Sequence, residues 1–252
     1  MDKLLAIQCF VKHDTLKVLL NYLSQCVDRE NYSVVFAIDS CVDMPYENRD
    51  HWYENNAIVN ELLNDYKNQK YHKETIIIKN KNNHGPFVTC YNLISYCMNM
   101  SDFIIFLEDD MLLSKDALIF YQKSYEFLKD NAELFAISTT SVTNSTDKKD
   151  LYKLQKCNWV GSSEFAVTKK TWEKYGYLRG NKTAGDVDFG YACRNNNMYT
   201  FSPLVSRARR IGFYHNDSYS SYYHNKFYNQ NFEYEPDSNK FDINYEEKLS
   251  LI

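Results

Sequence analysis

Closely spaced cysteines are missing from this sequence. Its 7 Cys are scattered singly, with no Cys-x-x-Cys and no Cys/His cluster at zinc-ligand spacing, which argues against a structural zinc site. Because the number is odd and several of them lie within apolar runs, we expect small buried residues in a reducing compartment. A chain of 252 residues can bury a core without disulfides or a metal.

Long apolar runs and an excess of positive charge are also missing. No apolar stretch approaches the roughly 20 residues that span a bilayer, and no signal peptide precedes the first apolar run, so we expect a cytoplasmic protein. The formal net charge of −4 argues against a nucleic-acid partner. Gly and Pro are scarce, at 7 and 4, whereas Tyr and Phe reach 22 and 15. Some of these rings could stack on carbohydrate, but the count alone does not establish it.

Short apolar runs and amphipathic segments alternate through the first half of the chain. The apolar runs predict strands over 4–11, 32–38, 75–78, 103–107 and 134–138, and the segments between them predict helices over about 14–26, 50–70, 88–98 and 114–130. We expect Gly85-Pro86 to break the chain before the third helix and Ser114 to cap the fourth. Repeated βα units predict an α/β fold with an open, mostly parallel sheet flanked by helices, in a single domain.

The second half has weaker periodicity. We expect a polar surface loop over 141–156, strand-like chain over 157–168, helices over 171–175 and 186–195, and a strand over 200–204. No internal repeat or linker divides the chain.

Three carboxylates follow the fourth predicted strand. Glu108, Asp109 and Asp110 end the buried run FIIFL, at the edge of the sheet where open α/β folds bind ligands. Such close carboxylates repel one another, and Mg²⁺ or Mn²⁺ would neutralise them while taking further ligands from substrate phosphates. The cation would then stabilise a diphosphate leaving group. The alternative is a solvated turn before the next helix.

The segment FIIFLEDDMLLSKDAL resembles the metal-binding DxD-type motif of GT-A fold glycosyltransferases, in the EDD form of the N-acetylglucosaminyltransferase I group. Four other segments are similar to this family in order and spacing: LAIQCFVKHDTLKVLLNYL, VVFAIDS, NNHGPFVTCYNLI and AGDVDFGYACR. PLVSRARRIGFYHNDS resembles a segment of bacterial family 2-like relatives, P-x-x-S-R-x-x-N-I-G. The resemblance covers about residues 4–217 and implies a Rossmann-like GT-A domain.

The resemblance also implies an activity. A sugar would pass from a nucleotide diphosphate donor, UDP-linked rather than GDP-linked, to a hydroxyl of a glycan or lipid-linked glycan, with Mn²⁺ or Mg²⁺ as cofactor and inversion at the anomeric carbon. A bacterial surface polysaccharide is a suitable acceptor, and the enzyme could contact the inner face of the membrane peripherally. The chain would divide into a nucleotide-sugar half (1–112), an acceptor-binding half (113–217) and an aromatic tail (218–252).

Donor and metal residues follow from matching the motifs residue by residue. Asp110 is expected to ligate the cation, with His215 as a further ligand. The expected contacts to the nucleotide sugar are Val11, Asp39, His84, Glu108, Asp109, Arg207 and Arg210. Arginines suit bidentate contacts to a diphosphate, although a solvated basic turn or a contact to anionic lipid is the alternative for this cluster.

Asp186 is the candidate general base, since a direct displacement needs a carboxylate to take the acceptor's proton. The expected acceptor contacts are Trp159, Gly161, Glu164 and Asp188. Helix capping is the alternative for the two aspartates, and a core position is the alternative for Trp159. Two positions depart from the family's pattern, Gly185 where Glu is usual and Arg210 where Asn is usual.

Two rival functions stay open at this stage. A sugar nucleotidyltransferase also pairs a doubly wound sheet with acidic metal ligands, but residues 11–16 (VKHDTL) lack the Gly-rich loop usual there. A non-catalytic sugar- or partner-binding protein on a GT-A scaffold is the second rival, and the Gly185 departure keeps it open.

Overall fold

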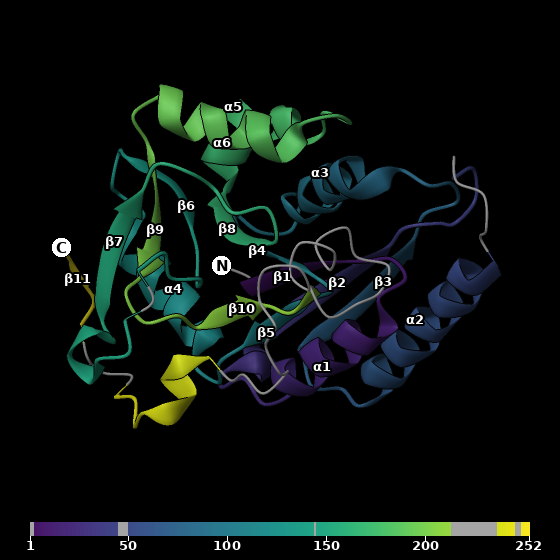
Figure 1. Cartoon of the computed structure of the whole chain (residues 1–252), viewed down its shortest axis with the longest axis horizontal. Helices are drawn as coiled ribbons and strands as arrows, with labels where there is room; N and C mark the ends of the chain where they lie inside the picture. Colours follow the sequence, from purple (N-terminus) through teal and green to yellow (C-terminus); the bar gives the residue numbers. More distant parts are fainter. Residues whose placement is uncertain (1–2, 45–49, 144, 213–235, 245–247) are drawn as a thin grey trace, which may run out of the picture.

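A computed structural model of the chain describes residues 3–44, 50–143, 145–212, 236–244 and 248–252 (Figure 1). The helices are α1 (His13–Leu23), α2 (Asp50–Asn68), α3 (Gly85–Cys97), α4 (Ala117–Leu128), α5 (Lys169–Arg179) and α6 (Gly185–Asn195). The strands are β1 (Lys3–Cys9), β2 (Tyr32–Ile38), β3 (Glu74–Lys79), β4 (Phe103–Glu108), β5 (Met111–Leu113), β6 (Leu134–Ile137), β7 (Lys153–Cys157), β8 (Glu164–Thr168), β9 (Tyr199–Pro203), β10 (Ala208–Arg210) and β11 (Ser250–Leu251).

The main sheet has the strand order β11-β7-β9-β6-β8-β4-β1-β2-β3. Strands β4, β1, β2 and β3 are mutually parallel, whereas β8 runs antiparallel between β4 and β6. The chain moves from β1 through β2 to β3 on one side and then returns to β4 on the other side of β1. This reversal makes a topological switch point at the carboxyl ends of β1 and β4, the place where open α/β sheets bind ligands.

Helices cover both faces of the sheet, as predicted for an α/β fold (Figure 1). Successive side chains of β1 alternate between two cores. Leu5 and Ile7 pack in the core that includes residues of α1, α2 and α4, whereas Leu4 and Ala6 pack in the core that includes residues of α3, α5 and α6. Burial on both faces explains why the strand is a continuous apolar run in the sequence.

Two expected helix starts are wrong. Gly85-Pro86 does not break the chain but begins α3, with Gly85 at φ +74° and Pro86 in the first turn, where a missing N–H costs no hydrogen bond. Ser114 does not cap α4, because the helix begins at Ala117 and Asp116 occupies the N-cap position. The polar loop expected over 141–156 ends earlier, at the start of β7.

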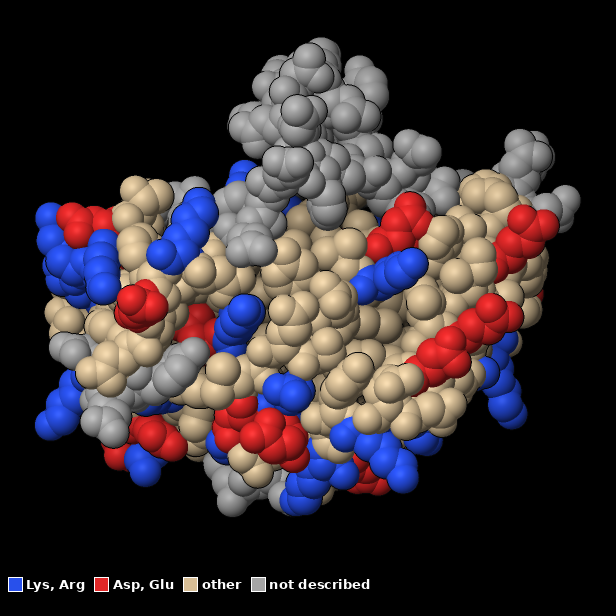
Figure 2. Space-filling model, turned by 90° about the horizontal axis from the view of Figure 1, so that it is seen from below, with Lys and Arg blue, Asp and Glu red and all other residues tan. Residues whose placement is uncertain are grey.

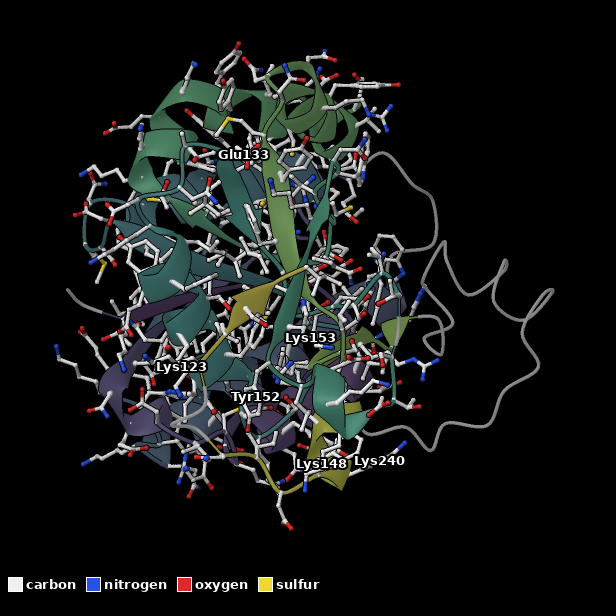
Figure 3. The ribbon with its side chains drawn as sticks, turned by 90° about the vertical axis from the view of Figure 1, so that its left-hand side faces the viewer. Lys123, Glu133, Lys148, Tyr152, Lys153 and Lys240 are labelled. Atoms are coloured by element: carbon white, nitrogen blue, oxygen red, sulfur yellow. The ribbon has the colours of Figure 1, made fainter. Side chains whose placement is uncertain are left out.

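Charged side chains are interspersed on the surface. On the face that includes α1 and α2, acidic and basic groups alternate (Figure 2). Lys148, Lys153 and Lys240 lie on the side of the molecule that carries β7 and β11 (Figure 3), and Lys153 pairs with Asp150 at 2.8 Å. Among the residues placed by the structure, no helix combines the length and apolarity needed to cross a bilayer.

Candidate functional site

The acidic triplet, residues 108–110, lies at the switch point that the strand order creates. Glu108 ends β4 and stands in register with Gln8 of the neighbouring β1. Two contacts hold the turn that follows β4. Strand β5 pairs with β10, and the Asp110 carbonyl accepts from the N–H of Ile211 at 2.7 Å. The strand end and the basic segment near residue 210, far apart in sequence, therefore meet at one place.

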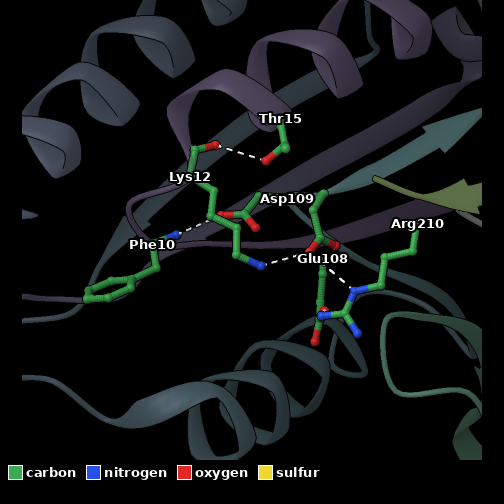
Figure 4. Close-up of polar contacts among 7 residues, drawn as sticks. Phe10, Lys12, Thr15, Glu108, Asp109 and Arg210 are labelled. Atoms are coloured by element: carbon green, nitrogen blue, oxygen red, sulfur yellow. Dashed lines mark hydrogen bonds and ion pairs between the residues drawn. The ribbon is translucent and has the colours of Figure 1, made fainter. Parts of the chain in front are cut away.

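Two cations pair with the triplet (Figure 4). Asp110 Oδ2 lies 2.7 Å from Lys12 Nζ and 3.3 Å from Arg210 Nε, and Arg210 Nη2 lies 3.2 Å from Glu108 Oε2. Sequence reasoning assigned Arg210 to the donor but overlooked Lys12. The available signal was its position, because a lysine directly after the first strand must lie beside whatever follows the adjacent parallel strand.

Burial and charge separate the pKa values of the triplet. Burial, opposed by Lys12, raises the pKa of Asp109 to about 7, although this carboxylate accepts a hydrogen bond from the Phe10 N–H at 3.0 Å. Burial and the charge of Asp110 raise the pKa of Glu108. Asp110 is fully buried, which raises its pKa, but the charges of Lys12 and Arg210 outweigh burial and hold the pKa below its ordinary value.

The carboxylates of the triplet have the chemistry to hold a divalent cation if other ligands complete its shell. Asp110 Oδ1 is buried and has no hydrogen-bond partner among the described residues. Gly212 lies so close that a Cβ there would be 1.9 Å from Asp110 Oδ2, so only glycine leaves room at this carboxylate. Nowhere in the described ranges do three His, Cys, Asp or Glu side chains surround a metal position by themselves. Mg²⁺ and similar ions in nucleotide sites take one or two protein carboxylates and complete their shell with phosphate and water.

Asp39 and His84 are brought together at the end of β2. The buried Asp39 carboxylate accepts hydrogen bonds from Asn80 Nδ2 at 2.9 Å, from Asn83 Nδ2, and from the backbone N–H groups of His84 and Gly85. These bonds fix the start of α3, and the His84 side chain is exposed. Val11 is buried, and its carbonyl accepts from the His13 N–H at 3.0 Å.

Asp186 lies in the first turn of α6, half-buried, and its Oδ1 accepts from the Val187 N–H at 2.9 Å. Asp188 instead accepts from Asn181 Nδ2 and so ties down the loop before the helix. The usual Glu could not replace Gly185, because a Cβ there would lie 2.2 Å from the carbonyl oxygen of Arg179. This departure from the family pattern has a steric cause.

Two expected ligand contacts are corrected by burial. Arg207 is 1% exposed: its Nε pairs with Asp116 at 2.7 Å, and its other nitrogens donate to the carbonyls of Val205 and Leu151. It is a core group and not a diphosphate contact. Glu164 is also buried, where it accepts from the hydroxyls of Tyr121, Ser138 and Thr139 and from the N–H groups of residues 139 and 140. Its oxygens are used inside the protein and do not line an acceptor cleft.

Trp159 is half-buried against α6. Its ring packs over Gly190, where a Cβ would be 2.8 Å away, and it meets Tyr191 edge-on at 5.7 Å between ring centroids. Arg194 lies over the same ring at 5.7 Å. Tyr191 is 48% exposed and escaped sequence reasoning, although an aromatic residue one helical turn and a half after Asp186 was visible in the motif. Gly161 is exposed nearby in sequence, and His215 lies outside the described residues.

No family model and no curated protein matches this sequence. Solved structures do match: S. aureus TarS residues 1–349 align with a TM-score of 0.54 and 13% identity, over 83% of this chain and 60% of that one. A second S. aureus TarS structure gives a TM-score of 0.47 and 13% identity, over 81% of this chain and 37% of that one. The chain therefore spans less than two thirds of the TarS structures. The likeness to the first of these structures confirms the predicted α/β fold, a single domain with a large central sheet flanked by helices.

Proposed function

We propose that this protein is a glycosyltransferase that moves a sugar from a nucleotide diphosphate donor, UDP-linked rather than GDP-linked, to a hydroxyl of a glycan. One observation carries the proposal. Three carboxylates lie at the topological switch point of a GT-A fold, and the buried Asp110 among them keeps an oxygen without a partner. A cell-surface glycan or its lipid-linked precursor is the acceptor class we favour, and peripheral contact with the membrane would suit it.

The donor half of the reaction depends on charge. A Mn²⁺ or Mg²⁺ ion held by Asp110 would neutralise the diphosphate as it leaves. Arg210, which already lies against Glu108 and Asp110, adds a second positive group beside the departing phosphates. His84 and the backbone at Val11 would contact the nucleotide, and Glu108 and Asp109 the hydroxyls of the sugar or ribose.

The acceptor half depends on Asp186. Its carboxylate would take the proton of the acceptor hydroxyl while that oxygen forms its bond to the anomeric carbon and the bond from that carbon to the diphosphate oxygen breaks. Attack from the face opposite the leaving group inverts the anomeric configuration. The rings of Trp159 and Tyr191, which meet edge-on at α6, would offer an aromatic surface to the acceptor sugar.

The two rivals are weaker on particular observations. The segment after β1 enters α1 at once and contains no glycine that could wrap a triphosphate, which disfavours a nucleotidyltransferase. The Gly185 departure, the main reason to consider a decayed binding protein, follows from the close approach of the Arg179 carbonyl.

The test is a panel of UDP- and GDP-sugars with and without Mn²⁺, with release of nucleoside diphosphate as the readout. Wild type should hydrolyse or transfer one donor slowly in the presence of metal. Asp110→Asn should lose metal-dependent nucleotide binding, whereas Asp186→Asn should keep binding and lose transfer. If no nucleotide sugar binds or turns over, the proposed function is rejected. If Asp186→Asn transfers at the wild-type rate, Asp186 is rejected as the base.

A further inference from the structure

Lys12 occupies the position from which a bound cation would be repelled most strongly. Its Nζ lies 2.7 Å from Asp110 Oδ2, the carboxylate proposed as the metal ligand. Its backbone is fixed, because its carbonyl accepts from Thr15 Oγ1 at 3.2 Å and from the Leu16 N–H at 3.0 Å. Its side chain is 20% exposed, so the ammonium at the end of a flexible stem can leave Asp110 without moving the helix (Figure 4).

We propose that Lys12 competes with the divalent cation for Asp110 and transfers to the donor diphosphate when the cation binds, so that cation and nucleotide bind as a unit. This inference rests on the proposed function. It makes Lys12 a donor-binding residue that also couples the binding of the metal to the binding of the nucleotide.

The charges of the cluster support this coupling. With all three carboxylates ionised, Lys12 and Arg210 leave one negative charge uncompensated. A divalent ion alone would turn this into an excess of one positive charge, with like charges a few ångströms apart at a fully buried carboxylate. The two negative charges of a nucleoside diphosphate sugar would return the cluster to one net negative charge and give the Lys12 ammonium a new partner.

Geometry separates the two cations. Arg210 bridges Glu108 and Asp110 from β10, which is itself paired with β5. The ion pair of Lys12 with Asp110 joins it to a single carboxylate through a rotatable side chain. We therefore expect Lys12 to leave Asp110 when the cation binds, while Arg210 keeps its contacts with Glu108 and Asp110.

The experiment measures Mn²⁺ binding by electron paramagnetic resonance and UDP binding by calorimetry, each with and without the other ligand. In wild type, UDP should raise the Mn²⁺ affinity roughly tenfold or more, and Mn²⁺ should raise the UDP affinity by the same factor, since coupling is reciprocal. Lys12→Met keeps the apolar stem and removes the charge. It should bind Mn²⁺ alone more tightly than wild type does, bind UDP more weakly, and show a smaller coupling factor.

Lys17→Met is the matched control, since Lys17 lies exposed on the same helix, and it should behave as wild type. Lys12→Arg should restore most of the coupling, and Lys12→Gln guards against an effect of the methionine side chain. If Lys12→Met binds Mn²⁺ alone no better than wild type, or keeps the full coupling factor, this inference is overturned while the proposed function stands. If wild type binds neither UDP nor Mn²⁺, both fail.

Discussion

Glutamate at position 185, the usual residue of the glycosyltransferase motif that this segment resembles, should destabilise this protein. A Cβ at Gly185 would lie 2.2 Å from the Arg179 carbonyl oxygen, 2.9 Å from its carbonyl carbon and 3.1 Å from Phe87 Cβ. Contacts below 3.0 Å require movement, and here the nearest atom is backbone, so the end of α5 or the start of α6 must shift by about 1 Å.

The magnitude can be bounded. Overpacking of this kind costs about 1–3 kcal/mol, and replacing glycine in the first turn of a helix returns up to about 1 kcal/mol. From the middle of both ranges, we expect Gly185→Ala to lower the free energy of unfolding by about 1–2 kcal/mol, and Gly185→Glu to do at least as much. For a chain of this size, such a loss corresponds to a fall in Tm of about 2–8 °C.

Urea and thermal unfolding followed by circular dichroism provide the measurement, with Gly161→Ala as the control. A Cβ at Gly161 would meet only the Glu164 carbonyl at an ordinary 3.6 Å. The alanine variant at position 185 separates the steric effect from the charge of glutamate. If both variants at position 185 are as stable as wild type, the steric explanation is refuted, and loss of function becomes the explanation for glycine at this position.

Three further expectations concern other parts of the site. Burial raises the folded-state pKa of Asp109 to about 7, so the contribution of this group to stability is present below about pH 4 and is lost as pH rises through 7. Asp109→Asn should therefore gain stability relative to wild type between pH 4 and 8. A stability difference between the two proteins that stays constant in urea titrations across this pH range would contradict this. Arg207→Ala leaves Asp116 buried without its cation and should lower the free energy of unfolding by about 3–5 kcal/mol. A variant that is as stable as wild type but binds nucleotide more weakly would instead assign Arg207 to the donor site. Tyr191→Ala should raise KM for the acceptor severalfold with donor KM unchanged; equal effects on both would remove the tyrosine from the acceptor face.

The part of the fold that sequence predicted well is the part buried on both sides. The predicted strand over 32–38 coincides with β2, and the one over 103–107 is a single residue shorter than β4, because continuous apolar runs between breaks mark their own boundaries. The less buried β3 extends one residue beyond the predicted 75–78 at each end. Strands β5 and β10 were missed. Each has three residues, and their pairing joins segments nearly a hundred residues apart, so no local pattern marks them.

The site was predicted in outline for a similar reason. A strand that ends in Glu108, Asp109 and Asp110 must present them at the sheet edge, and the structure places them there. Which arginine of residues 207–210 points inward depends on a partner on another element, Asp116, and the basic run contains no periodicity to reveal it. Glu164 was misassigned because its hydroxyl partner Tyr121 comes from α4, 43 residues earlier.

The seat of Trp159 on Gly190 has a consequence for how acceptor preference could change. The indole packs on Gly190 of α6, the helix whose first turn carries Asp186, and a helical rise of about 1.5 Å per residue sets the distance along the helix from Gly190 to Asp186. In the proposed transferase, the ring and the carboxylate would therefore keep their spacing when surrounding loops move. Selection for a different glycan would then act first on the residues of this helix.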